Sequence, residues 1–219
     1  MSSATSSAWA AEERGLNGSG SPSPGDGPVA VLPRQFYRRD PREVAPELLN
    51  KVLVRGPLSG RIVEVEAYAG AEDPGSHAFR GLTRRNATMF GPPGHLYVYF
   101  TYGMHWCANA VCGEEGEGVA VLLRALAPLS GLDQMRAARL KARRDRDLCS
   151  GPGKLCQAFA VTKEDDGADL VTGNRDLVIT DTGVAPPALP VMTTRVGLSV
   201  GADLPWRWYV PGEPNVSRR

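Results

Sequence analysis

The chain has 219 residues, of which 42% are hydrophobic, so it is long enough to fold as a moderate-sized domain with a sizeable core. Its formal net charge of +1 does not by itself indicate a polyanionic partner. No apolar run is long enough to span a membrane, and the N-terminus lacks the basic and apolar segments of a secretory signal. We therefore expect a cytoplasmic protein with no membrane partner.

The four cysteines, at positions 107, 112, 149 and 156, follow the spacings C-x4-C and C-x6-C. Neither spacing is typical of a zinc site, and no histidine pair lies nearby in ligand register. We expect reduced, partly buried thiols and no bound metal. No motif in the chain predicts a cofactor.

The composition divides the chain into two parts. Residues 1–30 are rich in Ser, Ala, Gly and Pro and have little to bury, so they are predicted to be a disordered tail, and residues 31–219 a folded domain. Early in this domain, Asp40 is a candidate N-cap and Pro41 the first position of a short helix that ends near Asn50. A strand over 51–55 and a tight turn over 56–60 are expected to follow.

Residues 61–68, with the sequence RIVEVEAY, are predicted to form the strand that returns from this turn. Because side chains alternate along a strand, Glu64, Glu66 and Tyr68 share one face, and the other face is apolar. One interpretation is the solvated polar face of an edge strand. The alternative is a partly buried pair of carboxylates whose repulsion raises the pKa of each, which suits one of them to abstract a proton.

The next segments combine a long loop with a hairpin. Residues 69–95 have no regular pattern, and a loop of this length within a compact domain is often functional, although His77 alone could be an ordinary surface histidine. Residues 96–111 are predicted to form a β-hairpin with Tyr102 near its tip. Tyr97 and Tyr99 share one face of it. Either these tyrosines pack in the core, or one lines a pocket while Tyr102 protrudes as a wedge for a base stack.

Residues 119–125, with the sequence VAVLLRA, are nearly continuously apolar and predict a central strand that is covered on both faces. Arg124 interrupts the apolar run, and a buried guanidinium needs a partner. Pairing with Glu64 or Glu66 is the structural interpretation. The functional alternative is that Arg124 positions a water molecule or an anion.

Ser130 is expected to cap a helix that runs through Leu132, Met135 and Leu140. Residues 132–154 include seven basic and three acidic side chains, a local net charge of +4. This stretch is either a solvated helix face or a basic stripe that follows phosphates.

A glycine-rich turn precedes a further predicted helix. Gly151 and Gly153, followed by Lys154, form an entry to a helix that can bind an anion, although the turn is not a nucleotide P-loop. Residues 177–180, 195–197 and 206–210 are predicted to be the remaining strands.

Six motifs occur in an order that resembles the alkyladenine (3-methyladenine) DNA glycosylase family, and the similarity extends from about Arg34 to Ser217. The resemblance implies a mixed α/β (α+β) fold, a single domain around a curved, mostly antiparallel sheet with a protruding β-hairpin that inserts into DNA. The motifs are RIVEVEAY at 61–68, T-x-R-N-x-x-M-F at 83–90, P-G-x-L-Y-V-Y at 93–99, Y-G-M at 102–104, V-L-L-R-A at 121–125 and C-S-G-P-x-K-L at 149–155.

The resemblance also implies roles for individual residues. Glu66 would be the general base that activates water, and Arg124 would help to hold that water. Tyr102 would replace the extruded nucleotide in the DNA stack. The base pocket would be formed by Tyr68, His77, Tyr99 and Asn109, with the tyrosines stacking on the base, His77 touching its edge and Asn109 excluding the exocyclic amine of guanine.

DNA phosphates are expected to bind at Gly151, Gly153, Lys154 and Arg85. The predicted activity is base-excision repair: alkylated or deaminated purines (3-methyladenine, 7-methylguanine, hypoxanthine, ethenoadenine) are flipped out and the N-glycosidic bond is hydrolysed, leaving an abasic site. No lysine lies between Lys51 and Lys141, which predicts a monofunctional enzyme without lyase activity. We expect a monomer that binds damaged double-stranded DNA, nucleoid-associated if bacterial.

Two other classes of protein are alternatives to the glycosylase. A zinc base deaminase needs the motifs H-x-E and P-C-x-x-C, and neither is present. A non-catalytic DNA-damage recognition protein would have the same pocket and wedge. The presence of Glu66 and Arg124 favours the glycosylase.

Overall fold

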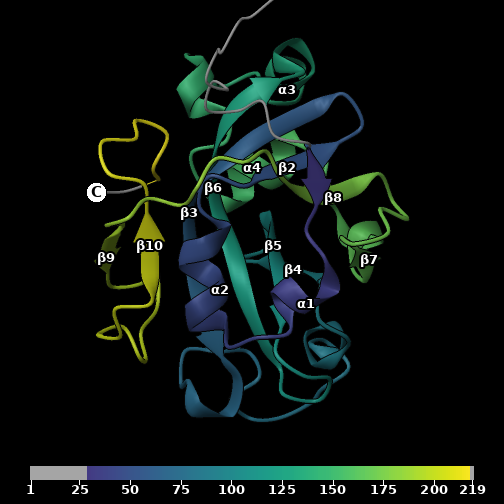
Figure 1. The fold of residues 1–219 in the computed structure, drawn as a ribbon, viewed down its shortest axis with the longest axis vertical. Coiled ribbons are helices and arrows are strands. Elements are labelled where there is room, and N and C mark those ends of the chain that lie inside the picture. Colours follow the sequence, from purple (N-terminus) through teal and green to yellow (C-terminus); the bar gives the residue numbers. More distant parts are fainter. Residues whose placement is uncertain (1–28, 218–219) are drawn as a thin grey trace, which may run out of the picture.

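The computed structural model describes residues 29–217 of the chain (Figure 1). The disordered tail predicted over residues 1–30 therefore lies outside the described residues, apart from its last two positions. Ala30 already belongs to the first strand, in which Ala30 pairs with Asp181 and Val31 pairs with Thr180.

A ten-stranded antiparallel sheet organises residues 29–217, with the strand order β1-β8-β2-β3-β6-β5-β4-β7 and with β10 added to β3 and β9 to β10. The sheet is strongly curved and carries only a few short helices, so the predicted mixed α/β single domain is confirmed (Figure 1). The strands are β1 (Ala30–Val31), β2 (Val52–Arg55), β3 (Leu58–Ala69), β4 (His95–Thr101), β5 (His105–Cys112), β6 (Val119–Ser130), β7 (Ala168–Asp169), β8 (Leu177–Asp181), β9 (Val191–Thr193) and β10 (Arg207–Tyr209).

The helices are short and lie at the ends and over one face of the sheet (Figure 1). α2 forms where the sequence predicts it: Asp40 accepts a hydrogen bond from the backbone N–H of Arg42 at 2.7 Å, Pro41 is the first helical residue, and Val44 is buried. The α-helices are α1 (Arg34–Tyr37), α2 (Pro41–Leu48), α3 (Leu132–Ala138) and α4 (Pro152–Ala158), and the 3-10 helices are η1 (Gly70–Glu72), η2 (Ala87–Phe90), η3 (Asp145–Asp147) and η4 (Lys163–Asp165).

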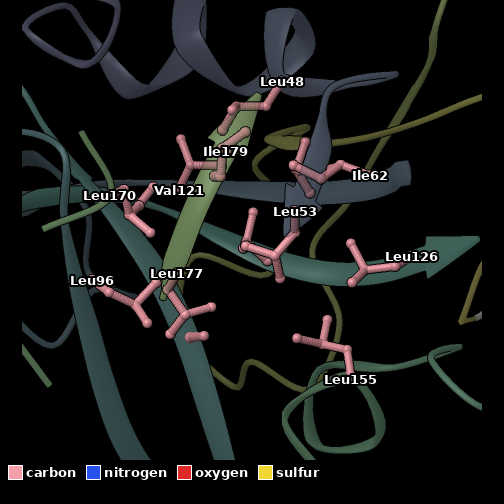
Figure 2. Packing of buried hydrophobic residues seen from close by; sticks show 14 of the residues in the cluster. Leu48, Leu53, Ile62, Leu96, Val121, Leu126, Leu155, Leu170, Leu177 and Ile179 are labelled. Atoms are coloured by element: carbon pink, nitrogen blue, oxygen red, sulfur yellow. The ribbon is translucent and has the colours of Figure 1, made fainter. Parts of the chain in front are cut away.

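The main core fills the concave side of the sheet, between the strands and the helices α2 and α4. Figure 2 shows Leu48 of α2, Leu53 of β2, Leu126 of β6 and Leu155 of α4 directed into this interior. Alternate residues of β3 to β6 point to the opposite face, where a second, smaller cluster forms around Tyr97. This second face is the one that holds the polar residues of the candidate site.

β3 is an interior strand. It pairs with β6 along its length, with β2 at its beginning and with β10 near its end. Glu64 and Glu66 are each 0% exposed. The interpretation of residues 61–68 as an edge strand with a solvated polar face is therefore wrong, because β10 and β6 cover both of its edges at the glutamates.

Three boundaries differ from the sequence predictions. β3 begins at Leu58, so the turn after β2 is shorter than the predicted 56–60. Ser130 does not cap α3: its hydroxyl hydrogen-bonds Ser59 and the backbone oxygen of Pro57, and Gly131, with φ +73°, occupies the N-cap. α3 ends at Ala138, and Leu140 beyond it is 88% exposed.

Residues 195–197 do not form a strand. The neighbouring strand β9 ends at Thr193, and Arg195 enters an irregular loop that crosses the second face of the sheet. Its side chain explains this path, because the guanidinium bonds to the backbone oxygens of Ala67 and Gly201 and so holds the loop against β3. The cysteines of the described chain are free and buried. None of its helices has the length and apolarity that a membrane span requires.

Candidate active site

The candidate site is a row of side chains that crosses five strands on the second face of the sheet. Tyr97 of β4 is opposite Asn109 of β5, Asn109 is opposite Leu122 of β6, Leu122 is opposite Glu66 of β3, and Glu66 is opposite Arg207 of β10. Because every second residue of a strand shares a face, positions two residues away add further members. These are Tyr99, Arg124 and Tyr68.

Glu66 is a buried carboxylate with a partner on each oxygen. Oε1 accepts a hydrogen bond from the backbone N–H of Val196 at 2.7 Å and lies 3.2 Å from Nη1 of Arg124. Oε2 accepts from the hydroxyl of Tyr68 at 2.9 Å. Burial raises the pKa of Glu66 above its ordinary value of 4.5, against the opposing effects of the Arg124 charge and the two hydrogen bonds. Glu66 is therefore a stronger base than a solvated glutamate.

Arg124 bridges the two glutamates of β3, so both structural pairings considered from the sequence occur together. Its Nε donates to Oε1 of Glu64 at 2.9 Å, and its Nη2 donates to the hydroxyl of Ser217 at 3.1 Å. Glu64 also accepts from Nε of Arg207 at 2.8 Å and from the backbone N–H of Ser217 at 2.6 Å. Glu64 thus fixes the guanidinium that faces Glu66.

Beside Glu66, aromatic rings line a pocket. Tyr97 and Tyr99 are stacked with ring centroids 5.5 Å apart, and the ring of His77 meets Tyr99 edge-on at 4.5 Å. The inner part of the pocket is a narrow cavity of about 50 Å³. A wider cavity of about 410 Å³ adjoins it, shares Tyr68, His77 and Tyr99 with it, and extends to Tyr102, Arg124, Pro152 and Val196.

His77 and Asn109 contribute polar atoms to the inner cavity. Nδ1 of His77 lies 3.2 Å from the hydroxyl of Tyr97, and burial lowers the pKa of His77, so the imidazole is neutral at pH 7. Asn86 holds the backbone of His77 by donating to its carbonyl oxygen at 2.8 Å. Asn109 donates to the carbonyl oxygen of Tyr97 at 3.1 Å. The structure therefore brings all four predicted base-pocket residues together.

Tyr102 stands at the mouth of the wider cavity, at the tip of the β4–β5 hairpin. It is 77% exposed and has a positive φ of +50°, followed by Gly103 with φ +65°. The turn thus directs the ring out of the sheet. The sequence left open whether the hairpin tyrosines pack in the core or whether Tyr102 protrudes. Tyr97 packs in the second cluster, and Tyr102 protrudes.

Comparisons with known proteins agree with this geometry. Residues 35–214 match the family described as Methylpurine-DNA glycosylase (MPG). The chain belongs to the methylpurine-DNA glycosylase family. Similar proteins, each named "Putative 3-methyladenine DNA glycosylase", include one from Burkholderia lata, 60% identical over 87% of this chain and 92% of the relative. Others are from Koribacter versatilis (48%, over 86% and 94%) and Methanoculleus marisnigri (48%, over 86% and 100%).

In this DNA glycosylase, the residues predicted to bind phosphates flank the hairpin. Gly153 lies so close to His105 that a Cβ would come within 2.8 Å of its side chain, and Lys154 donates to the hydroxyl of Ser150 at 3.1 Å. Gly151 has a φ of +153° just before α4. On the other side, Arg85 donates to the backbone oxygen of Phe100 at 3.1 Å.

The basic stretch at 132–154 of the glycosylase is largely a solvated face. Arg136 pairs with Asp133 at 2.6 Å and with Asp145 at 2.8 Å, and Arg144 pairs with Asp147 at 3.2 Å. These pairs use the three acidic side chains of the stretch, so its net charge of +4 remains on the other basic residues. In the described part of the chain, no group of three or more His, Cys, Asp or Glu side chains could hold a metal ion.

Sequence reasoning missed several residues of the glycosylase site, among them Arg207, which donates to Glu64. Val196 and Ser217 hold the two glutamates through backbone N–H groups, and Asp73 and Arg195 form a buried ion pair behind Tyr68. A backbone N–H leaves no signature in a sequence. The signal for the ion pair is the isolated charge of Arg195 between apolar and small residues, although the sequence predicts a strand there.

Proposed function

We propose that this DNA glycosylase acts on duplex DNA that carries alkylated or deaminated purines, such as 3-methyladenine, 7-methylguanine, hypoxanthine and ethenoadenine. It rotates the damaged nucleotide out of the helix and hydrolyses its N-glycosidic bond, which leaves an abasic site. The observation that carries the proposal is the position of Glu66. All three of its partners, Tyr68, Arg124 and Val196, line the wider cavity.

The proposed reaction is a displacement by water. The water oxygen bonds to C1′ of the sugar as the bond from C1′ to the base nitrogen breaks, and the electron pair of that bond leaves with the base. Glu66 takes the proton of the water, and its charge stabilises the oxocarbenium-like sugar. Arg124 holds the water beside the carboxylate. For a cationic base such as 3-methyladenine, the departing electron pair neutralises the ring, so no acid is required.

The aromatic pocket supports the proposed choice of bases. Tyr68 and Tyr99 would stack on the two faces of the flipped base, and a ring that carries positive charge is attracted to such faces by about 0.5–2 kcal/mol. His77, neutral at pH 7, would meet the edge of the base, and Asn109 would exclude the exocyclic amine of guanine. Tyr102 would fill the vacated stack, which offsets part of the cost of flipping. Gly151, Gly153, Lys154 and Arg85 would contact the phosphates on either side.

Single-turnover base release tests the proposal. Duplexes that carry hypoxanthine or ethenoadenine, and methylated DNA, are incubated with excess wild type, Glu66→Gln or the surface control Glu47→Gln. We expect release by wild type and by the control, and near-complete loss in Glu66→Gln, whose lesion binding persists. If the wild type binds lesions tightly and releases no base, the protein is a damage-recognition protein instead.

We also propose that the enzyme is monofunctional and works as a monomer. A lyase forms a Schiff base through an amine, and the span from Lys51 to Lys141, which contains Glu66, Arg124 and the four predicted base-pocket residues, has no lysine between its ends. Borohydride treatment during turnover should trap no covalent complex with DNA. A trapped complex would contradict the monofunctional assignment without affecting the glycosylase proposal.

A further inference from the structure

A completely buried ion pair lies behind the pocket and outside the chemistry proposed above. Arg195 and Asp73 have side-chain exposures of 0%. The two terminal nitrogens of the Arg195 guanidinium, Nη1 and Nη2, donate to the Asp73 carboxylate at 2.5 and 2.7 Å. The two residues are 122 positions apart in the chain. Asp73 follows η1 at the end of β3, so the pair joins this end of β3 to the loop that follows β9.

Arg195 fixes more than the ion pair. Its Nη1 donates to the carbonyl oxygen of Ala67 at 3.0 Å, and its Nη2 donates to that of Gly201 at 3.1 Å. The guanidinium lies over the ring of Tyr68, 4.7 Å from the centroid. Tyr68 lines both cavities, whereas Arg195 lines neither, so the guanidinium supports the ring from the side away from the pocket.

Two of the three partners of Glu66 are therefore set by Arg195. Tyr68, which donates to Oε2, is stacked on the guanidinium, and Val196, whose N–H donates to Oε1, is the next residue in the chain. The third partner, Arg124, is fixed independently by Glu64 and Ser217. Because the loop contains no helix or strand between β9 and β10, its position depends on side-chain anchors of this kind.

We propose that Asp73 and Arg195 are positioning residues, which act together to hold the Val196 N–H and the Tyr68 ring against Glu66 and on the wall of the base pocket. The inference rests on the proposed function. Neither residue touches the substrate. Loss of the pair would let the 195–201 loop move away from β3 and would weaken the hydrogen bonds that Glu66 accepts from Val196 and Tyr68.

The consequence for proton transfer has a definite sign. Both of these hydrogen bonds lower the pKa of Glu66, so their loss raises it further. A base that must be ionised then becomes active only at higher pH. Other titratable and charged groups also face Glu66 or its partners. They are Glu64 and Tyr68 of β3, Arg124 of β6, Tyr99 of β4, Cys107 of β5 and Arg195 itself. Arg207 of β10 acts through its contact with Glu64.

The test compares Arg195→Lys, which keeps both charges of the pair, and Asp73→Asn with wild type and with Arg55→Lys. Arg55 is a matched control, because it makes an equivalent two-nitrogen pair with Asp165 at 3.0 Å and is not part of the site. Single-turnover release of 7-methylguanine, a cationic base that needs no acid to depart, is measured from acid to alkaline pH at saturating enzyme, with lesion-duplex Kd and thermal unfolding measured separately. If Asp73→Asn does not fold, Arg195→Lys carries the test.

We expect the rate at neutral pH to fall by up to about 100-fold in both site variants, as a small displacement of a catalytic group can cause. The acidic, rising part of the pH–rate profile of both site variants should move to higher pH, so their rates should approach the wild-type rate as the pH rises. Arg55→Lys should match wild type at every pH. A deficit that is equal at every pH, or no deficit, overturns the inference and leaves the proposed function intact. A wild type that releases no base overturns the proposed function itself.

Discussion

At the scale of single residues, burial and charge act on Glu66 in opposite directions. Burial is the larger effect and raises its pKa, whereas Arg124, Val196 and Tyr68 lower it. The second glutamate, Glu64, adds only a small further increase to that pKa. The repulsion between carboxylates that the sequence suggested is therefore present, but desolvation dominates, and desolvation could not be inferred from the strand pattern alone.

This balance predicts the pH dependence of catalysis. A general base is active when ionised, so single-turnover base release should rise with pH through the pKa of Glu66 and then level off. Because that pKa is raised, the midpoint of the rise should lie above 4.5. The profile is measured by quenched-flow release of 7-methylguanine, a cationic base that needs no acid to depart, at saturating enzyme. A midpoint at or below 4.5, or a rate that does not change with pH, would contradict the assignment of Glu66 as the base.

At the scale of elements, β3 combines a structural glutamate, Glu64, with the proposed general base, Glu66, two residues further on. Glu64 is 0% exposed and accepts hydrogen bonds from Arg124, Arg207 and Ser217. Glu64→Ala removes the acceptor that they share, and we expect it to lower the free energy of unfolding by about 3–5 kcal/mol. Urea denaturation measures the change. The control Glu47→Ala, at a surface pair with Arg39, should cost less than about 1 kcal/mol.

The hairpin predicts a different kind of effect. Tyr102 is exposed and makes only a long hydrogen bond, at 3.4 Å, to the carbonyl oxygen of Gly197, so Tyr102→Ala should leave stability nearly unchanged. Loss of its stacking should slow base release from a duplex lesion by about 10- to 100-fold. A lesion in single-stranded DNA, which needs no wedge, should be affected far less. The control is Met104→Ala, also at the exposed tip. If it slows base release as much as Tyr102→Ala does, the effect belongs to the tip as a whole and not to the Tyr102 ring.

Elements with a local signature could be predicted from the sequence. Asp40 and Pro41 mark the start of α2, the alternation of residues 96–111 marks the hairpin, and the apolar run at 119–125 marks the central strand β6. The loop at 195–201 could not be predicted in this way, because its path is fixed by a partner 122 residues away. The same holds for the cap of α3, where a glycine with positive φ replaces the expected serine.

At the scale of the whole molecule, a net charge of +1 accompanies proposed phosphate contacts at only a few residues beside the hairpin. Non-specific DNA affinity should therefore be modest and should fall linearly on a logarithmic salt axis. Lys154→Ala and Arg85→Ala should each reduce the slope of that line by about 1. Fluorescence anisotropy over a salt series measures it. Arg38→Ala, which removes an equal charge from a pair with Glu114, should keep the wild-type slope.

The way in which the whole molecule brings the site residues together could be predicted from the sequence only through its resemblance to a known family. Residue patterns predicted strands that carry Glu66, Tyr99 and Arg124, but nothing local showed that β3, β6, β5 and β4 are neighbours in this order. The six motifs supplied that order, because the family shares it. Neither route predicted the contacts of Glu66 with the backbone N–H of Val196 and of Glu64 with the backbone N–H and hydroxyl of Ser217, since both partners come from the distant C-terminal part of the chain.

The contacts that β3 makes with the last part of the chain have a consequence for the biosynthesis of the protein. The pocket residues from Tyr68 to Asn109 leave the ribosome well before Val196, Arg207 and Ser217, which complete the hydrogen bonding of the two glutamates. A nascent or prematurely terminated chain that stops at β8 would carry the aromatic pocket and the wedge but would lack these partners. Such a fragment could approach damaged bases without the groups that set its carboxylates for hydrolysis. If the proposed function holds, completion of translation is thus the step that makes base release possible.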